Sequence, residues 1–417
     1  MTASGYPLLT ALMAPCPAAE FLEQHWPRRP FATHGSPQRL PAVLRDDALA
    51  SPAALAQRYR GNLRFTHGGC ARMIEIDRVN PLTLQDMGMT LQFADLARCV
   101  PGADAFLREL EAELGVHERS AAISAFASPR DDGLSCHYDA QDLISIQLHG
   151  SKRFSYAPVK EIRNPYGTQF VPHGRPFDEL YAQAAAGFPD PRNADFTTTE
   201  MRPGSVLFLP RGTWHRTTAS ENSLSVSVMV DQPPALECLL EQLRMLLLQD
   251  AEWRQPLYGA PATGTRGEQA LARSEELLAG LPERIAQLKP GDLLRALSSV
   301  ERRMREITLG TRFQRTPDAR LNCEMHQGGA AATVSVWVEQ TPTRSQLAAK
   351  FDVPASAIST FRWIEAQTEG PFTTAALQAA FPALPFATLS EVLQLCVKAQ
   401  FLKLLWFAPL KSSTANC

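Results

Sequence analysis

Three side chains that could bind a transition metal occur in two short segments. His137 and Asp139 stand two positions apart in HYD, and residues two apart on a strand point to the same face. His215 follows the apolar run GSVLFLP and a Pro-Arg-Gly turn. Two imidazoles and one carboxylate, with coordination positions left open, are a donor set that holds iron(II) while other ligands reach it. His137, Asp139 and His215 are therefore our candidate metal ligands and catalytic residues.

Each half of this set has an ordinary explanation when it is taken alone. A His-x-Asp pair arises by chance in many chains. A single histidine after a strand is more often exposed or hydrogen-bonded within the fold. The combination is harder to explain by chance, because both halves lie on predicted strands of one barrel.

Lys152 is a fourth candidate, fifteen positions after His137 in DLISIQLHGSKRFSYAP. A Gly-Ser turn precedes it, and strand alternation sends Lys152 and Arg153 to opposite faces. An unpaired ammonium is costly inside a barrel, but a dicarboxylate could pair with it through the end that does not bind the metal. The alternative is a hairpin lysine as exposed as Arg153. If Lys152 points inward, Phe154 and Tyr156 should flank the same pocket wall.

Two serines could add polar groups to this pocket. Ser225 and Ser227 alternate on SLSVSVMV, so both would point to one face of a strand. We take both serines as candidate contacts of the ligand that would bind in this pocket. Ordinary strand serines explain the pattern as well.

The segments that position these residues alternate with a period of two. Between about residues 120 and 230, the runs that predict short strands are SAAISAFAS, DLISIQLHG, KRFSYAPV, GSVLFLP and SLSVSVMV. Short strands joined by tight turns favour an antiparallel barrel or sandwich. A stretch rich in Pro, Gly and Asn between Pro158 and Met201 surrounds the helix-like FDELYAQAAAG, and a long insertion of this kind is often a lid or binding loop.

Helical periodicity is found on both sides of the strands. Before residue 115, FADLARCV and DAFLRELEAEL space their apolar residues as amphipathic helices do. After Pro234, two predicted helices carry apolar stripes, the first with Leu236, Leu239, Leu240, Leu243 and Leu247, the second with Leu293, Leu294, Leu297 and Val300. Such leucine-rich helices should pack on the barrel, on each other or across a dimer interface.

The last part of the chain combines one predicted strand with short helices. ATVSVWVEQ predicts the strand, and TRSQLAAKF, TTAALQAAF and LSEVLQLCVKAQFLKLLW predict helices in an order that resembles a winged-helix module. Its charges are mixed, so the footprint of a DNA reader is missing. We expect a protein-contact or structural module without direct nucleic-acid binding.

Composition limits the remaining classes. The 417 residues predict two or three domains, and a net charge of −2 gives no global attraction to nucleic acid or anionic membranes. Eight cysteines are scattered singly, which fits reduced thiols. The first residues lack a basic region before a short apolar stretch, and no run is long enough to span a membrane. We therefore expect a cytoplasmic protein.

The metal and pocket motifs together carry a resemblance to a known family. HYD, Lys152 and PGSVLFLPRGTWH resemble the JmjC-type 2-oxoglutarate oxygenases, most closely the ribosomal oxygenase (cupin-4) branch. FLEQHWPRRPFATHG and ENSLSVSVMV look like further segments of that branch. The resemblance covers nearly the whole chain, although its motifs are specific only in the barrel.

The resemblance implies an α+β fold around a double-stranded β-helix, the jelly-roll barrel of cupins and JmjC proteins. The oxygenase domain, with an N-terminal helical segment, would span residues 1–234. A helical dimerisation domain would span 235–325 and a winged-helix-like domain 326–417, giving a homodimer.

By position, His137, Asp139 and His215 match the family's Fe(II) ligands, and Lys152 matches the basic residue that binds the distal carboxylate of 2-oxoglutarate. The chain departs from the pattern in two places. Bacterial members of this branch often have Arg where Lys152 stands, and lysine can act there as a point charge. The usual Gly-rich stretch before the H-x-D motif is SPRDDGLSC here, so a second partner for that carboxylate is not assigned.

The implied reaction converts 2-oxoglutarate and O₂ to succinate and CO₂ while a C–H bond is hydroxylated. The first hypothesis is hydroxylation of an amino-acid side chain in a protein, most often a ribosomal protein in this family. A tailoring hydroxylase of a biosynthetic peptide or small molecule is the second, and a cupin-like binding protein without turnover is the third. Intact ligands and Lys152 count against the third, and the helical extensions favour the first.

Overall fold

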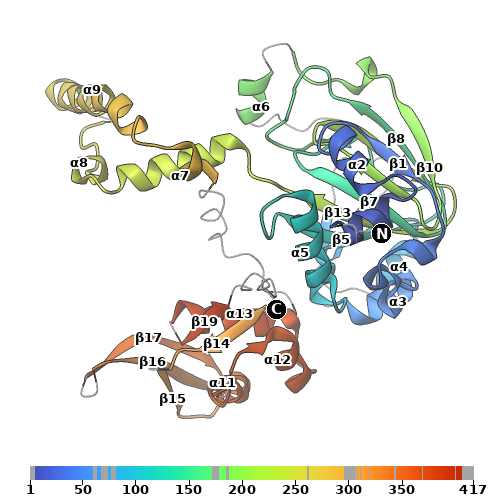
Figure 1. The fold of residues 1–417 in the computed structure, drawn as a ribbon. Coiled ribbons are helices and arrows are strands. Elements are labelled where there is room, and N and C mark those ends of the chain that lie inside the picture. The colour runs from blue at the N-terminus through green and yellow to red at the C-terminus, as the bar shows by residue number, and fades with distance from the viewer. Residues whose placement is uncertain are drawn as a thin grey trace, which may run out of the picture.

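The computed structural model shows a β-barrel that carries helices on one side and continues into a helical arm and a C-terminal module (Figure 1). It describes residues 5–59, 63–66, 74–76, 81–170, 178–184, 187–260, 263–294, 307, 309, 311–317, 319–341, 344–368, 370–399 and 401–405. In this part of the chain, no helix combines the length and the apolar character that crossing a bilayer requires.

The larger sheet of the barrel has eight strands in the order β1-β11-β7-β13-β5-β4-β2-β3, with antiparallel neighbours. Their bounds are β1 Phe31–Thr33, β2 Leu63–Thr66, β3 Ile74–Ile76, β4 Thr90–Phe93, β5 Ala121–Ser128, β7 Asp142–His149, β11 Val206–Leu209 and β13 Ser223–Val230. The predicted strands that correspond to β5, β7, β11 and β13 are confirmed.

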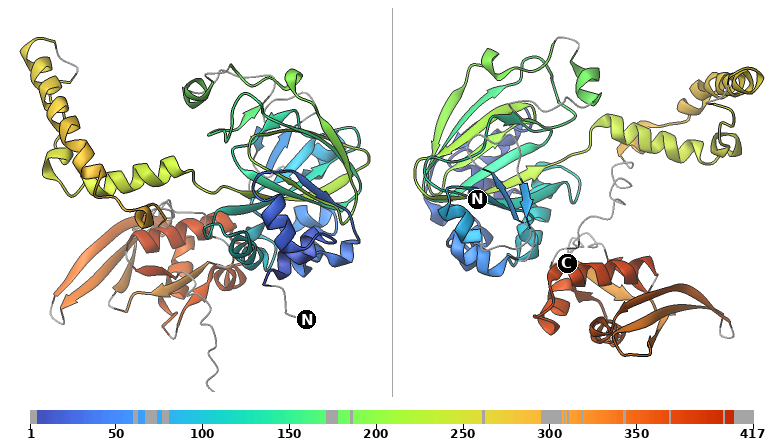
Figure 2. Two further views of the ribbon diagram at one scale, coloured as in Figure 1. Left: turned by 45° about the horizontal axis from the view of Figure 1, so that its top comes forward. Right: turned by 180° about the vertical axis from the view of Figure 1, so that it is seen from behind.

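The smaller sheet has five strands in the order β10-β8-β12-β6-β9. Their bounds are β6 His137–Tyr138, β8 Lys152–Pro158, β9 Gln169–Phe170, β10 Thr197–Met201 and β12 Thr213–Ala219. Along the chain, β6, β10 and β12 join this sheet, while the strands that come directly after them, β7, β11 and β13, join the larger one. This alternation between two facing sheets is the double-stranded β-helix that the sequence resemblance implies (Figure 2).

The main apolar core lies between the larger sheet and the N-terminal helices. Ile144 and Ile146 of β7 and Val226 and Val228 of β13 are fully buried in this core. The helices on this side are α1 Pro7–Met13, α2 Ala18–Gln24, α3 Pro52–Arg58, α4 Pro81–Asp86 and α5 Ala103–Leu114. The alternate residues of the same strands, Ser145 and Ser225 among them, face the barrel interior, so each strand separates an apolar face from a polar one.

One predicted helix before residue 115 is confirmed and the other is wrong. DAFLRELEAEL forms α5, which ends at Gly115 with φ +69, a left-handed cap that glycine adopts without strain. FADLARCV instead continues from the end of β4 into a 3-10 turn, Leu96–Arg98. Asp95 has φ 50, so the backbone there leaves the right-handed helical region.

The insertion between β8 and β10 covers the outer face of the smaller sheet. It contains β9 and α6 Asp178–Gln183, within the predicted FDELYAQAAAG. Leu180 of α6 packs with Tyr138 and Trp214 in a small apolar cluster. Residues 171–177 lie outside the described part of the chain.

Beyond β13, a helical arm extends away from the barrel in every view (Figures 1 and 2). It consists of α7 Ala235–Leu247, α8 Ala251–Arg254 and α9 Thr265–Ile285. The first predicted leucine stripe lies on α7. In the second, Leu293 and Leu294 are described, whereas Leu297 and Val300 lie outside the described residues.

The C-terminal module has its own apolar core and two three-stranded sheets, β18-β14-β19 and β15-β16-β17. The bounds are β14 Arg312–Arg315, β15 Ala319–Met325, β16 Ala331–Thr341, β17 Arg344–Pro354, α11 Ile358–Glu365, β18 Phe372–Thr373, α12 Thr374–Ala380, α13 Phe386–Lys398 and β19 Leu402–Leu405. Strands β14 and β15 pair with later strands, so they group with this module although they precede the expected boundary at 325/326.

Two helix predictions in this module need correction. TRSQLAAKF lies in strand β17, because it pairs along β16 and this tertiary pairing outweighs its helical pattern. LSEVLQLCVKAQFLKLLW is helical only through α13 and then enters β19, which pairs with β14. ATVSVWVEQ and TTAALQAAF correspond to β16 and α12 as predicted. The winged-helix-like description stays a prediction.

Candidate metal centre

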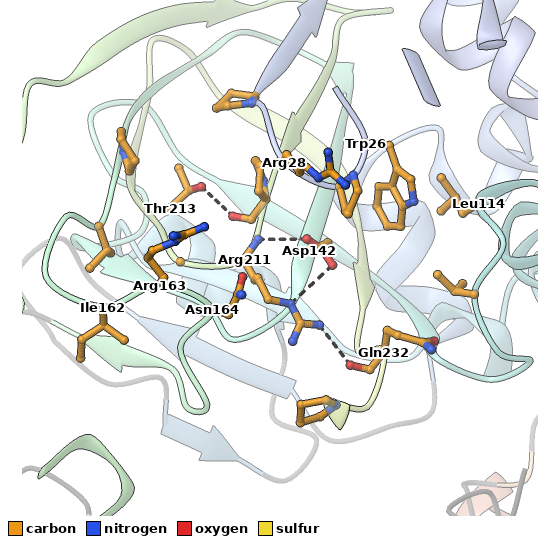
Figure 3. Close-up of a pocket in the computed structure, with 18 of the residues that line it drawn as sticks. Trp26, Arg28, Leu114, Asp142, Ile162, Arg163, Asn164, Arg211, Thr213 and Gln232 are labelled. Atoms are coloured by element: carbon orange, nitrogen blue, oxygen red, sulfur yellow. Dashed lines mark hydrogen bonds and ion pairs between the residues drawn. The ribbon is translucent and has the colours of Figure 1, made fainter. Parts of the chain in front are cut away.

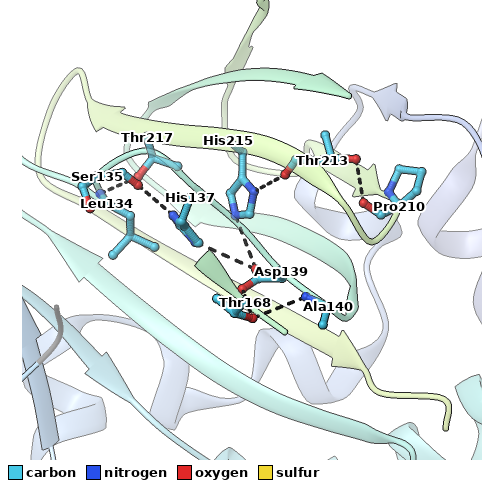
Figure 4. A network of polar contacts seen from close by, with 10 residues as sticks. All are labelled: Leu134, Ser135, His137, Asp139, Ala140, Thr168, Pro210, Thr213, His215 and Thr217. Atoms are coloured by element: carbon cyan, nitrogen blue, oxygen red, sulfur yellow. Dashed lines mark hydrogen bonds and ion pairs between the residues drawn. The ribbon is translucent and has the colours of Figure 1, made fainter. Parts of the chain in front are cut away.

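The three candidate ligands meet in one place inside the barrel (Figure 4). His137 on β6 and His215 on β12 are directly paired across neighbouring strands, and their ring centroids lie 4.1 Å apart. Asp139 follows β6, and its Oδ2 is 3.9 Å from His137 Nε2 and 3.6 Å from His215 Nε2. The potential ligand atoms all lie within 4.8 Å of one another, close enough to share one metal ion.

Hydrogen bonds to the outer ring nitrogens fix both imidazoles for metal binding. His137 Nδ1 is 2.7 Å from the Ser135 carbonyl oxygen, and His215 Nδ1 is 3.0 Å from the Thr213 carbonyl oxygen. Since a carbonyl only accepts, both Nδ1 atoms must donate, and in the neutral rings both Nε2 atoms keep their lone pairs for a metal. Thr168 Oγ1 donates to Asp139 Oδ1 at 3.2 Å and holds that carboxylate from its other side.

Burial keeps His215 in the state that a metal ligand requires. Desolvation, together with the nearby His137, lowers the pKa of His215 to about 4, although Asp139 opposes the shift. The ring is therefore neutral near pH 7, so its short distance to Asp139 is no ion pair. A divalent cation would compensate the charge of the half-buried Asp139 carboxylate and accept both nitrogen lone pairs.

The triad opens into a cavity of about 200 Å³ between the two sheets. Lys152, Ser225 and Ser227 line this cavity together with His137, Asp139 and His215. The structure thus brings together every candidate site residue that the sequence singled out. Further buried polar atoms of the barrel strands, Ser145 Oγ, Gln147 Oε1 and Ser223 Oγ, have no partner among the described residues.

Lys152 is the inward residue of its hairpin. Its side chain is 2% exposed, whereas Arg153 is exposed on the opposite face of β8. The ammonium lies 3.3 Å from Ser225 Oγ, to which it donates. Burial lowers the pKa of Lys152 to about 8, and the charge of Asp132 offsets part of this shift. A buried cation with one neutral hydrogen-bond partner is suited to receive a carboxylate.

The structure places the two expected wall residues of this pocket, Phe154 and Tyr156, differently. Phe154 lines the cavity. Tyr156 shares the inward face, since it pairs with His215, and it is half-buried against the apolar cluster that contains Phe154 and Leu143. Tyr156 is not among the described residues that line the cavity, so its place in the pocket wall stays a prediction.

Sequence reasoning missed several residues that the fold brings to the site. Thr168 bonds to Asp139, and the ring of Phe170 stacks on His137 with centroids 4.7 Å apart. Both come from the insertion, where no motif marks them. Gln92 and Arg64 line the cavity from β4 and β2 and are equally unmarked in the sequence.

A larger cavity of about 820 Å³ lies beside the turn between β11 and β12 (Figure 3). Arg211 in this turn donates from its backbone to Asp142 Oδ1 at 3.0 Å, and its guanidinium lies 3.7 Å from Asp142 Oδ2. Gly212 donates to the Asp139 carbonyl oxygen at 2.8 Å. Gly212 also has φ +70, which explains the glycine of the Pro-Arg-Gly turn. These contacts join the segment of Asp139 to the turn before His215. The triad does not line this cavity, so the metal chemistry belongs to the smaller one.

Comparisons with known proteins found several similar chains. The protein YxbC of Bacillus subtilis (strain 168) is 25% identical over 266 residues, covering 61% of this chain and 80% of YxbC. The bifunctional lysine-specific demethylase and histidyl-hydroxylase NO66 of Drosophila willistoni is 29% identical over 127 residues, covering 30% of this chain. The match spans only 15% of that NO66 protein.

Solved structures of YcfD from Escherichia coli are also similar. One is 15% identical with a TM-score of 0.46 and covers 94% of this chain and 99% of YcfD. Another, described as a ribosomal oxygenase in complex with cobalt and 2-oxoglutarate, is 16% identical with a TM-score of 0.42 and covers 94% and 99%. Residues 108–238, which contain the whole triad and Lys152, match the family model of the JmjC domain. The barrel segment of this chain therefore matches a JmjC domain.

Proposed function

We propose that the chain is an Fe(II)- and 2-oxoglutarate-dependent oxygenase that hydroxylates an amino-acid side chain of a protein. One observation carries the proposal: a His-Asp-His triad with both histidines buried shares a small cavity with the buried cation Lys152. The triad offers nitrogen and oxygen ligands for iron, and Lys152 offers a counter-charge at a second point. A metal-chelating dicarboxylate needs both.

The residues of the cavity match 2-oxoglutarate group by group. Its keto acid end would bind the metal between His137, Asp139 and His215, which leave coordination positions open. Its far carboxylate would accept hydrogen bonds from the Lys152 ammonium and the Ser225 hydroxyl, which already lie 3.3 Å apart. Ser227 lines the same cavity. When bound, the metal supplies the redox chemistry that converts 2-oxoglutarate, O₂ and a C–H bond to succinate, CO₂ and an alcohol.

A protein substrate is supported by the names of similar proteins and by the extensions of this chain. NO66 is called a histidyl-hydroxylase and YcfD a ribosomal oxygenase. The arm α7–α9 and the C-terminal module add surface that a small-molecule enzyme does not need. We therefore take a ribosomal protein as the first substrate to test. A tailoring hydroxylase of a biosynthetic peptide or small molecule is the alternative.

The direct test compares ribosomal proteins from cells with and without this chain by mass spectrometry. In cells that contain the chain, one residue of a ribosomal protein should carry an additional oxygen atom. In cells without the chain, the same residue should be unmodified. The same comparison with His215→Ala in place of the wild-type chain separates turnover from binding. Ribosomal proteins that are identical in all three samples would exclude this substrate and favour the alternative.

We also propose that the arm forms a homodimer interface. Leu236 and Leu240 of α7 are 52% and 50% exposed, and Leu271 and Leu278 of α9 are 62% and 61% exposed. Leucines exposed in such number on neighbouring helices mark an interaction surface. Analytical ultracentrifugation at micromolar concentration should show a dimer, and Leu240→Glu with Leu278→Glu should give a monomer. A wild-type monomer would contradict the interface.

We place the protein in the cytoplasm. The described cysteines Cys16, Cys99, Cys136, Cys238, Cys323 and Cys396 are free thiols, as a reducing compartment would keep them.

A further inference from the structure

Thr168, the residue immediately before β9, lies beside the metal ligand Asp139 (Figure 4). Its Oγ1 atom accepts a hydrogen bond from the backbone N–H of Ala140 at 3.3 Å. The same atom donates to Asp139 Oδ1 at 3.2 Å. A backbone N–H can only donate, so the hydroxyl proton of Thr168 is left for the carboxylate. The backbone of Ala140 therefore fixes the direction of the bond from Thr168 to Asp139.

The two carboxylate oxygens of Asp139 have different surroundings. Oδ2 lies 3.9 Å from His137 Nε2 and 3.6 Å from His215 Nε2, so it faces the point where the three ligands can share a metal. Oδ1 is the atom that accepts the hydrogen bond from Thr168. A carboxylate can bind a metal through one oxygen or through both. With Oδ1 engaged by Thr168, Oδ2 alone is left as the ligand atom.

The number of oxygens that Asp139 uses matters for the co-substrate. Two imidazoles and one carboxylate oxygen leave coordination positions open at the metal. In the proposed function, the keto acid end of 2-oxoglutarate chelates the metal and needs two neighbouring positions. If Asp139 bound through both of its oxygens, the second oxygen would compete with 2-oxoglutarate for one of them.

The chain on both sides of Thr168 is anchored to other elements. After Thr168, β9 pairs with β6, and the ring of Phe170 stacks on His137 with centroids 4.7 Å apart. Before Thr168, the hydroxyl of Tyr166 donates to Glu237 in the first turn of α7. Thr168 thus lies between one anchor at the metal centre and another on the helical arm. These contacts hold its hydroxyl against Asp139.

We propose that Thr168 is a positioning residue that limits Asp139 to coordination through one oxygen and so keeps a metal position open for the co-substrate. This inference rests on the proposed oxygenase function and adds to it a residue outside the triad. Thr168 is not among the described residues that line the cavity, so it acts through Asp139. Without the hydroxyl, the carboxylate can turn both oxygens to the metal, and 2-oxoglutarate must displace one of them.

The first experiment determines crystal structures of the manganese-loaded full chain, in which manganese takes the place of iron. Thr168→Val removes the hydroxyl and keeps nearly the same shape, whereas Thr168→Ser keeps the hydroxyl. We expect one Asp139 oxygen at the metal in the wild type and in Thr168→Ser, and both oxygens in Thr168→Val. One oxygen in all three proteins, or both oxygens in the wild type, would overturn the proposal.

The second experiment titrates 2-oxoglutarate into the same manganese-loaded proteins by calorimetry. Thr168→Val should weaken 2-oxoglutarate binding by roughly ten- to a hundredfold, the usual effect of losing a residue that orients a metal ligand. Thr168→Ser should restore most of the affinity. Manganese affinity should fall less than 2-oxoglutarate affinity in Thr168→Val, because the second carboxylate oxygen replaces a water on the metal. Equal losses in both affinities would indicate general loosening of the site and would overturn the proposal.

Thr198→Val is the matched control for the loss of a threonine hydroxyl. Thr198 lies on β10 of the same sheet, where its exposed side chain hydrogen-bonds to Ser155 at 2.9 Å. This variant should keep the wild-type affinities for manganese and 2-oxoglutarate, and a loss equal to that of Thr168→Val would contradict the role of Thr168. The two proposals can fail separately. A wild type that binds manganese and 2-oxoglutarate as expected but forms no succinate with iron would exclude the oxygenase function and leave the role of Thr168 in coordination standing.

Discussion

The two faces of the larger sheet differ in chemical character. The outer face presents Ile144, Ile146, Val226 and Val228 to the N-terminal helices in one apolar core. The inner face presents Ser225 and Ser227 of β13 and Gln92 of β4 to the cavity with the triad, and Gln92 Oε1 has no partner among the described residues. Stability is thus gained on one face, while the other retains polar groups for a ligand. Substitutions on the outer face should therefore change the free energy of unfolding, and substitutions on the inner face should change activity and ligand binding.

The largest effect on function is expected at the triad. His137→Ala, Asp139→Ala or His215→Ala should each abolish 2-oxoglutarate-dependent succinate release and reduce bound iron, because a site with two remaining ligands rarely holds the metal tightly. The free energy of unfolding of the metal-free chain should change little, since the apolar core lies on the other face. Full activity in any one variant would remove that residue from the metal centre.

The largest effect on stability is expected at the outer face. Phe208 of β11 is fully buried and meets Phe21 edge-on, with ring centroids 5.5 Å apart. Phe208→Ala should lower the free energy of unfolding by about 3–5 kcal/mol, measured by urea denaturation. In the fraction that stays folded, the KM for 2-oxoglutarate should match the wild type. A changed KM with unchanged stability would mean that the two faces are not separate.

The outer and inner faces also differ in how far the sequence predicts them. Alternation along β5, β7, β8 and β13 was enough to predict the strands, and the spacing of His137, Asp139 and His215 was enough to predict the triad. Thr168, Phe170, Gln92 and Arg64 could not be found in this way. They reach the cavity only through the pairing of β9, β4 and β2 with strands far away in the chain, and no local motif records that pairing.

Helical periodicity was the less reliable signal for the same reason. The pattern of α5 agrees with the left-handed glycine that ends this helix. FADLARCV and TRSQLAAKF have comparable patterns, but a left-handed residue at Asp95 and the long pairing of β17 with β16 override them. Local propensity is a weak guide where an extended partner strand is available.

A smaller effect on function is expected at Lys152, where the cavity would bind the distal carboxylate of 2-oxoglutarate. Lys152→Ala should raise the KM for 2-oxoglutarate by roughly a hundredfold, since an unpaired buried carboxylate costs on the order of 3–5 kcal/mol and solvent entry recovers part of that cost. Arg153→Ala, on the exposed face of β8, should change this KM little. Succinate formation at varied 2-oxoglutarate gives both values. Equal effects in the two variants would contradict the role of Lys152.

The smallest expected effect is a pH dependence of 2-oxoglutarate affinity, which follows from the titration of Lys152. Burial lowers the pKa of Lys152 from 10.5 to about 8 in the folded chain without ligand. Above pH 8 the amine must take up a proton before it can pair with a carboxylate, so 2-oxoglutarate affinity should fall by up to roughly tenfold per pH unit. The contribution of Lys152 to the free energy of unfolding should change in the opposite direction as pH rises. Between pH 8 and 10.5 the unfolded chain binds more protons at this lysine than the folded chain does, so this group's contribution to folding improves as pH rises.

Lys152→Arg tests this linkage, because a guanidinium stays protonated throughout the range. Calorimetric titration of 2-oxoglutarate into the manganese-loaded protein, from pH 7 to about 9.5, avoids turnover and measures affinity alone. The wild type should bind progressively more weakly above pH 8, and the arginine variant should give a flat profile at whatever affinity its larger group allows. Parallel profiles would mean that a different group titrates, and Lys152 would then lose its assignment as the partner of the distal carboxylate. A flat wild-type profile would instead mean that bound metal and neighbouring charges keep Lys152 protonated, which would weaken the link between burial and co-substrate affinity.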